Sequence, residues 1–194
     1  MVAFAAIVEF LYRKVVPTLN RARTIRGEIT RYMEIYEIAQ KMSFRSLKNV
    51  LVTQIGIIYL SKEIRPSIAD VRFVYTRTQK DCGLRKLVAS HVAFANLTAG
   101  KKSKKGAGDG RRDRAVKEIQ PDVITELMTE FPDLGADIVN VSSGWFKDGR
   151  KGVLRLGKGL VCEVHEHSEG RYKNCRDAGK NWSDMVGDDD EAEE

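Results

Sequence analysis

Four residues toward the C-terminal end have the types and the spacing of a metal site. They fall within 14 residues, in the order Cys162, His165, His167 and Cys175. Structural zinc sites take four nitrogen and sulfur ligands in a tetrahedron, so this group predicts one structural Zn²⁺ with no open position for catalysis. The paired Cys-x-x-Cys spacing is absent, and the alternative is that two cysteines flank two surface histidines by chance.

A second group of side chains is basic and could contact phosphates. It lies in and just after a glycine-rich stretch, and it consists of Lys101, Lys102, Lys104, Lys105, Arg111, Arg112 and Arg114. A bipartite nuclear-import signal, a polyanion-binding arm and a solvated charged loop all fit this pattern. No aromatic residue stands between Ala99 and Lys117. Bases therefore have nothing to stack on there, and any nucleic-acid contact is expected to be weak, non-specific and salt-dependent.

The remaining nucleophile and base candidates do not form a catalytic group. Cys82 stands at the expected start of a helix, but no histidine motif near it suggests a base. His91 lies among Val88, Val92 and Ala95 and is expected to be a core histidine. The sequence therefore predicts a protein that is not an enzyme.

These residues must be positioned by a mainly helical chain. Apolar side chains recur at helical spacing, and proline, serine and glycine residues mark the boundaries. The predicted helices cover Val2 to Arg13, Glu28 to Met42, Phe44 to Leu60 with Ser43 as N-cap, a helix opened by Pro66-Ser67, one that follows Gly83, one begun by Pro121, and a short one from Pro132 to about Gly144. After Gly149 the pattern alternates, which predicts a small β-hairpin-like piece that holds the Cys/His group.

Composition and charge complete the predicted organisation. The 194 residues carry a net charge of +6, and an acidic tail from Asp184 to Glu194 makes the rest of the chain more basic than that value. The expected parts are a helical body (1–98), a basic flexible loop (99–118), a helical segment (119–146), a Cys/His-containing β-rich piece (147–182) and a disordered acidic tail (183–194). Three cysteines, an odd number, favour a reducing compartment, and we expect the nucleus or the cytoplasm.

Two segments of the first half resemble a known family. The strings Phe10-Leu11-Tyr12 and Tyr36-Glu37-Ile38-Ala39-Gln40-Lys41-Met42, followed by Leu47-Lys48, are similar to the second half of a BTB/POZ domain. The similarity continues in Ser67 to Thr76 and in Leu84-Arg85-Lys86-Leu87-Val88, which resemble the large fungal-type BTB proteins. Those proteins also have a C-terminal Cys/His stretch similar to Cys162 to Cys175.

The resemblance implies a fold and a function. It implies the helical second half of a BTB fold and the helices that follow it, without the first half of the domain. The apolar face of Phe4, Ile7, Val8 and Leu11 is then expected to lack its usual packing partners. The implied function is a non-enzymatic protein–protein interaction module, an adaptor or scaffold, which would form homo-oligomers or recruit a cullin-type ubiquitin ligase if the first half exists. The alternative is a basic nuclear or nucleic-acid-associated protein with a structural zinc site, and neither reading involves a membrane.

Overall fold

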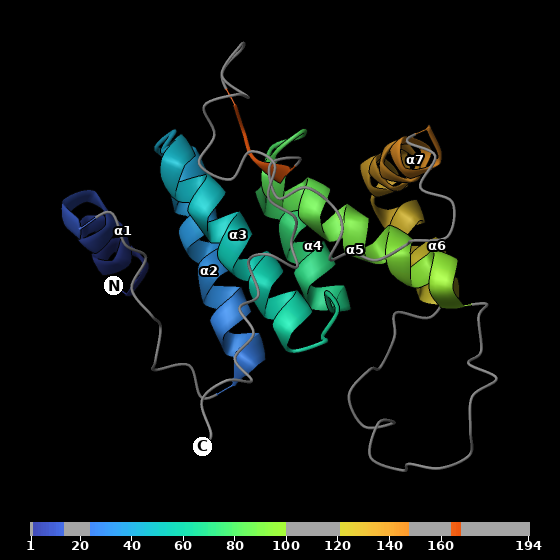
Figure 1. The fold of residues 1–194 in the computed structure, drawn as a ribbon, viewed down its shortest axis with the longest axis horizontal. Coiled ribbons are helices and arrows are strands. Elements are labelled where there is room, and N and C mark those ends of the chain that lie inside the picture. Colours follow the sequence, from blue (N-terminus) through green and yellow to red (C-terminus); the bar gives the residue numbers. More distant parts are fainter. Residues whose placement is uncertain (1, 14–23, 100–120, 148–163, 168–194) are drawn as a thin grey trace, which may run out of the picture. The chain divides into compact units, whose positions relative to one another are not determined.

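The computed structural model describes residues 2–13, 24–99, 121–147 and 164–167, and these are mainly helical (Figure 1). In chain order the helices are α1 (Val2–Arg13), α2 (Ile25–Lys41), α3 (Arg45–Ser61), α4 (Ile68–Arg77), α5 (Gly83–Ala99), α6 (Pro121–Glu130) and α7 (Pro132–Lys147). The predicted mainly α class is confirmed. Of the predicted hairpin-like piece only Val164–His167 is described, and these four residues do not form a strand.

The chain divides into two compact units. Unit 1 comprises Met1–Lys62 and Gly157–Glu194, and within it the described elements are α1, α2, α3 and the segment Val164–His167. Unit 2 comprises Glu63–Leu156 and holds α4, α5, α6 and α7. None of the helices in the described part of the chain is both long and apolar enough to cross a membrane.

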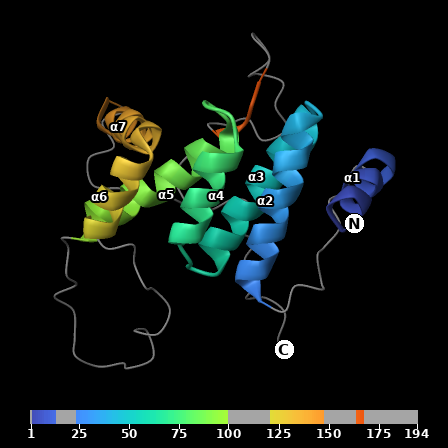
Figure 2. The same cartoon turned by 180° about the vertical axis from the view of Figure 1, so that it is seen from behind.

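The core of unit 1 forms where α2 and α3 pack side by side (Figure 2). The predicted apolar stripe of α2 is buried, with Ile29, Tyr36 and Ala39 fully excluded from solvent, and α3 contributes Leu51 and Ile55 in the same way. Burial of one such side chain stabilises the fold by about 1.5–3 kcal/mol. The α2–α3 pair is therefore held together mainly by apolar contacts that the sequence periodicity predicts.

The turn between α2 and α3 differs from the prediction. Ser43 is not the N-cap of α3, because Phe44 takes that position without a side-chain cap. Ser43 instead has a left-handed φ of 57°. Its N–H donates to the carbonyl of Gln40 (3.0 Å), and the Phe44 N–H donates to the carbonyl of Ala39 (2.8 Å). This pair of bonds is a Schellman ending of α2, in which the residue after the C-cap must turn left-handed to satisfy the last carbonyls.

Helix starts in the two units have clear local causes. α2 begins at Ile25, three residues earlier than predicted, because the Thr24 hydroxyl accepts a hydrogen bond from the Gly27 N–H (3.0 Å). α4 begins after Ser67, as the Pro66-Ser67 pair predicts. There the Ser67 hydroxyl accepts from the Asp70 N–H (3.2 Å) and the Asp70 carboxylate accepts from the Ser67 N–H (2.7 Å). This capping box satisfies two N–H groups at the start of the helix.

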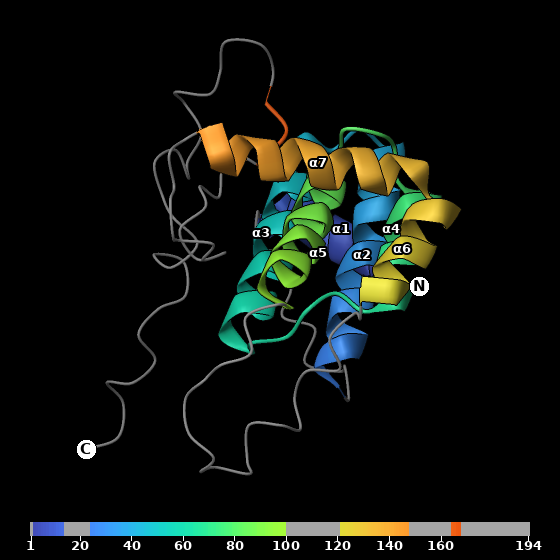
Figure 3. The same ribbon diagram turned by 90° about the vertical axis from the view of Figure 1, so that its right-hand side faces the viewer.

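Unit 2 packs α4, α6 and α7 around α5. Figure 3 shows α7 running across α5, and these two helices are in extensive contact. α5 supplies Leu84 and Val88 to the core, α4 supplies Val71 and Val74, and α7 supplies Leu134. α7 extends to Lys147, beyond the end predicted near Gly144. One glycine in a helix costs only about 1 kcal/mol relative to alanine, so the glycine does not stop the helix.

Candidate functional site

A short segment far along the sequence lies against α2 and α3 in unit 1. In this segment, Val164–His167, the side chains of Val164 and His165 are both buried. It is coloured red-orange in Figure 1. Its polar partners on the two helices are Tyr36, Lys48, Asn49 and Thr53. We call these four residues, with His165 and Glu166, the Glu166 cluster.

The Asn49 side chain binds the backbone of Glu166. Its amide nitrogen Nδ2 donates to the Glu166 carbonyl (3.1 Å), and its Oδ1 accepts from the Glu166 N–H (2.9 Å). One primary amide thus pairs with both backbone groups of one residue, as the edge of a β-strand would. The contact fixes the chain direction and position of the segment and does not depend on the side chain of residue 166.

The Glu166 carboxylate contacts a cation and a hydroxyl on the two helices. Lys48 Nζ pairs with Oε2, and the Tyr36 hydroxyl donates to Oε1 (2.9 Å). The Lys48 side chain is 10% exposed and the Glu166 side chain 22% exposed. Each ion is therefore largely removed from water and depends on the other for its compensation. A hydrogen bond between two ionised groups is stronger than one between neutral groups, so Lys48 favours a carboxylate over a neutral amide at this position.

The next contact of the segment is made by His165. Its Nε2 lies 2.8 Å from the Thr53 hydroxyl, in a buried position. Asn49 and Thr53 are four residues apart on α3, so they lie on the same face, one turn from each other. α3 therefore binds two successive residues of the segment with two successive turns.

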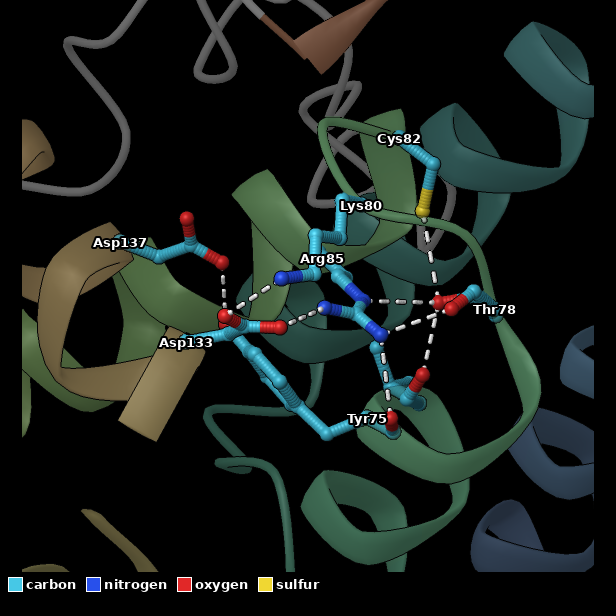
Figure 4. Close-up of polar contacts among 8 residues, drawn as sticks. Tyr75, Thr78, Lys80, Cys82, Arg85, Asp133 and Asp137 are labelled. Carbon is cyan, nitrogen blue, oxygen red and sulfur yellow. Dashed lines mark hydrogen bonds and ion pairs between the residues drawn. The ribbon is translucent and has the colours of Figure 1, made fainter. Parts of the chain in front are cut away.

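A second polar cluster, the Arg85 cluster, lies in unit 2 and is shown in Figure 4. Arg85 on α5 is buried, and its Nη2 donates to the carbonyls of Tyr75 (3.0 Å) and Thr78 (2.7 Å). Its Nε donates to the Thr78 hydroxyl (3.3 Å), and its guanidinium lies over the Tyr75 ring at 4.7 Å. The guanidinium thus holds the turn between α4 and α5, since it satisfies carbonyls that α4 leaves without a helical partner.

The Arg85 cluster also reaches α7. Arg85 Nη1 pairs with Asp133 (3.3 Å), which also accepts from Lys80 (3.0 Å). The Lys80 hydrogen bond is the main reason that the pKa of Asp133 lies below its usual value. The Tyr75 hydroxyl donates to Asp137 (2.8 Å), and burial together with this bond raises the pKa of Tyr75. These contacts attach the first two turns of α7 to α4 and α5.

Two of the side chains considered as catalytic candidates lie inside unit 2. Cys82 is buried, and its thiol donates to the Thr78 hydroxyl (3.4 Å). His91 is 3% exposed, as expected for a core histidine. Complete burial, and then the charge of Arg65, lowers the pKa of His91 to about 3. His91 is therefore neutral in the folded protein at neutral pH.

α1 has a wide apolar surface that divides into two adjoining faces. One face, with Ala6, Ile7 and Phe10, is buried, and α1 packs on α2. The other face exposes Phe4 (63%) and Leu11 (43%). Of the four residues expected to lack packing partners, Phe4 and Leu11 are exposed, Val8 is intermediate and Ile7 is buried. The outer face of α1, which we define as Phe4, Val8, Leu11 and the 86% exposed Tyr12, is the most apolar exposed helix face in the described residues.

The predicted zinc ligands are described only in part. Cys162 and Cys175 lie outside the described residues. The rings of His165 and His167 are 6.0 Å apart between centroids, and Nε2 of His165 already contacts Thr53. Within the described ranges, no three His, Cys, Asp or Glu side chains are grouped to hold a metal. The zinc site stays a prediction that involves residues beyond these ranges.

The predicted basic patch also lies outside the described residues. This applies to all seven of its members: Lys101, Lys102, Lys104, Lys105, Arg111, Arg112 and Arg114. The nuclear-import and polyanion-binding interpretations therefore stay predictions. A mobility shift of duplex DNA at low and at physiological salt would test the second of them, and no shift at low salt would eliminate it.

Comparisons with known proteins give no relative. No protein-family model matches the chain. No curated protein and no solved structure matches it either. The BTB/POZ resemblance stays a prediction that rests on the sequence motifs alone.

Sequence reasoning missed the central residue of each polar cluster. Glu166 stands between the two histidines proposed as zinc ligands, and it was assigned no role there. Its contacts with Lys48 and Asn49 join residues 118 and 117 positions apart, and no local pattern indicates such a pairing. Arg85 occurs in a segment used for the resemblance. A signal for it was present, since Arg85 precedes the buried Val88 and Val92 by three and seven residues and therefore lies on the buried face of α5.

Proposed function

We propose that this protein is a non-catalytic protein–protein interaction module of the BTB/POZ type, which acts as an adaptor or scaffold in the nucleus or the cytoplasm. Its contact surface is the outer face of α1, and its partners are other proteins. The single observation that carries the proposal is the exposure of Phe4 (63%) and Leu11 (43%) on a helix that already buries an adjoining apolar face.

The physical argument concerns the hydrophobic pattern of α1. A surface helix of a globular protein usually has one apolar stripe, and a helix that is apolar beyond this stripe is usually buried there as well. Water contact with Phe4, Leu11 and Tyr12 is unfavourable because large apolar side chains gain about 1.5–3 kcal/mol each when they are buried. Aromatic side chains such as Phe4 and Tyr12 are also enriched at protein interfaces. The outer face is therefore suited to a partner.

The polar clusters support a role in binding rather than in chemistry. Arg85 uses its donors to hold the α4–α5 turn and α7, and Lys48 is paired with Glu166. The Arg85 contacts position helices, and the Lys48 contact attaches the segment Val164–His167. The function proposed here needs a stable helical scaffold with one apolar surface, which the Arg85 cluster supports in unit 2 and the apolar core supports in the α2–α3 pair.

The test replaces the apolar surface by charge. In the variant, Phe4→Glu and Leu11→Glu are combined, and wild type and variant are compared by affinity capture from cell extract with quantitative mass spectrometry. The control is Val139→Glu, which introduces the same charge at a 59% exposed valine on α7. Proteins that the wild type and the control both retain should be depleted tenfold or more with the α1 variant, at unchanged helical content. Identical captured sets for all three proteins would contradict the proposal.

A further inference from the structure

We propose that α2 and α3 carry a recognition site for a short acidic peptide of a partner protein, and that the chain's own Val164–His167 occupies this site. The proposal concerns a surface other than the outer face of α1, and it does not depend on the function proposed above. The partner segment is defined by its chemistry. It presents a glutamate whose backbone lies against Asn49 and whose carboxylate lies against Lys48 and Tyr36.

The contacts to the segment are of the kind that can be made to any peptide of this composition. Asn49 pairs with the N–H and the carbonyl of residue 166, which every residue except proline possesses. The carboxylate contact supplies the selectivity, because an amide in place of the carboxylate would leave the largely buried Lys48 without a counter-charge. A peptide thus needs one glutamate in a short segment, preceded by a residue that can contact Thr53.

The receptor side of the site belongs to helices that pack independently of the segment. Tyr36 is part of the α2 stripe, fully buried, and Lys48, Asn49 and Thr53 lie on α3. The α2–α3 pair is held by its apolar core and by the Schellman turn at Ser43. Groups fixed on packed helices are preorganised, so little ordering is required of them when a ligand binds. The site is expected to persist when Val164–His167 leaves it.

Occupation by the chain's own segment would regulate the site. The segment belongs to the same chain, so it competes with a partner peptide at an effective concentration that depends on its connection to α3 and not on the protein concentration. A partner peptide in solution then meets mostly occupied sites, and its apparent affinity falls by the fraction of sites that are open. Weakening of the internal contact should therefore raise the affinity for an added peptide.

The experiment uses the full chain and a fluorescent peptide of residues 163–168, acetylated and amidated at its ends. Binding is measured by fluorescence polarisation to the wild type, to Glu166→Ala, and to the matched control Glu9→Ala, which removes the carboxylate of an exposed ion pair on α1. The peptide should bind the Glu166→Ala chain about tenfold or more tightly than it binds the wild type or the control. Glutamine in place of the peptide's central glutamate should weaken binding about tenfold or more.

Two results would overturn the proposal. One is equal affinity of the peptide for wild type and Glu166→Ala, since the peptide would then bind elsewhere. The other is the absence of binding to a Glu166→Ala chain that keeps its helical content. The addition of Asn49→Ala to the Glu166→Ala chain should abolish binding, and undiminished binding there would equally contradict the site.

A second measurement needs no variant and covers the case in which Glu166→Ala does not fold. Carbodiimide joins a carboxylate and an amine in direct contact, with loss of water, and Lys48 and Glu166 of the wild type should be joined in this way. Excess peptide should lower the yield of the Lys48–Glu166 product and form a product between Lys48 and the peptide's glutamate, both quantified by mass spectrometry. An unchanged internal product without a peptide product, or no internal product at all, would overturn the proposal.

Discussion

The two polar clusters both contain an ion pair with a buried basic side chain, but the Arg85 cluster fixes a turn between helices and the Glu166 cluster attaches a separate segment to helices. In the Arg85 cluster the guanidinium binds carbonyls ten and seven residues before it, so it holds the turn of its own helix pair. In the Glu166 cluster the helices bind a segment more than a hundred residues away, and the helices already share an apolar core. The comparison teaches that a buried charge can either complete a fold or attach a separate segment to one that is complete.

This difference sets the order of the expected effects. Removal of a group that satisfies the carbonyls of a turn leaves those acceptors buried and unpaired, which affects the whole unit. Removal of a group that holds an attached segment affects the segment first and the helices little. Substitutions in the Arg85 cluster should therefore affect all of unit 2, and substitutions in the Glu166 cluster should affect mainly Val164–His167.

The largest effect is expected for Arg85→Met. The variant keeps most of the side-chain volume but leaves the carbonyls of Tyr75 and Thr78 without their donor, and we expect the free energy of unfolding to fall by about 3 kcal/mol. Urea unfolding followed by circular dichroism measures it. Arg85→Lys, the control, keeps the charge but cannot bind both carbonyls and stack on Tyr75, so it should recover only part of the loss. A change below about 1 kcal/mol in Arg85→Met would remove the distinction between the clusters.

The second expected effect is a loss of stability at acid pH, because burial in unit 2 disfavours the protonated form of His91. The donors of the buried Arg85 are paired with carbonyls, whereas burial lowers the pKa of His91, on the same helix, to about 3. The unfolded chain binds a proton at a histidine pKa of about 6.5 and the folded chain does not, so stability is lost as the pH falls through that range.

Between about pH 7 and pH 5 the expected loss from His91 is about 2 kcal/mol. This window lies above the range in which Asp133 takes up a proton, because the pKa of Asp133 is lowered. Urea unfolding at several pH values, with wild type and His91→Gln, measures the slope. The variant has no proton to bind at this position, so its slope should be smaller by that amount. Equal slopes would show that His91 does not set the acid sensitivity of unit 2.

A smaller and more local effect is expected for Asn49→Ala. The Glu166 N–H loses its acceptor, and its hydrogen exchange should become about tenfold faster, which corresponds to roughly 1.4 kcal/mol. Exchange of the α2 and α3 core amides should stay unchanged, because the apolar core holds these helices. Amide exchange resolved by NMR or by mass spectrometry of peptides measures both. Loss of protection throughout α2 and α3 would mean that the segment is required for the helix pair.

The smallest effect is expected for Asp133→Asn. The Asp133 side chain is 45% exposed and its partner Lys80 is 74% exposed, so solvent and salt screen this pair. We expect a thermal midpoint close to that of the wild type in physiological salt, measured by circular dichroism. A large decrease would show that the ion pair to α7, and not the carbonyls of the turn, is what Arg85 contributes.

Much of the helical framework could be predicted from the sequence, because its signals are local. The stripe that includes Ile29, Tyr36 and Ala39 is buried as its spacing indicates, and Pro66-Ser67 opens α4. Ser43 was misassigned because serine favours the N-cap position. In the structure Ser43 instead follows the C-cap of α2 and takes the left-handed conformation that a Schellman ending requires. A sequence window does not show which of two adjacent helix ends a residue will serve.

The candidate sites were less predictable than the helices. The outer face of α1 could be expected in part, since Phe4 and Leu11 were identified as a face without partners and are exposed, but Ile7 of the same set is buried. Periodicity places residues on a helix and does not say which of two apolar faces meets the neighbouring helix. The Glu166 cluster could not be predicted, because its partners come from two helices and a segment far along the chain.

The sequence by itself determined the mainly helical class, the buried stripe of α2 and the start of α4, because these depend on side-chain spacing and on contacts within a few residues. The tertiary structure alone decided which buried charges would be paired. Burial of an ion is favourable only when a partner and its hydrogen bonds are in place, and that condition joins Lys48 on α3 to Glu166, 118 residues later. The same condition is met at Arg85, whose donors are paired with carbonyls, whereas burial keeps His91, on the same helix, neutral at neutral pH.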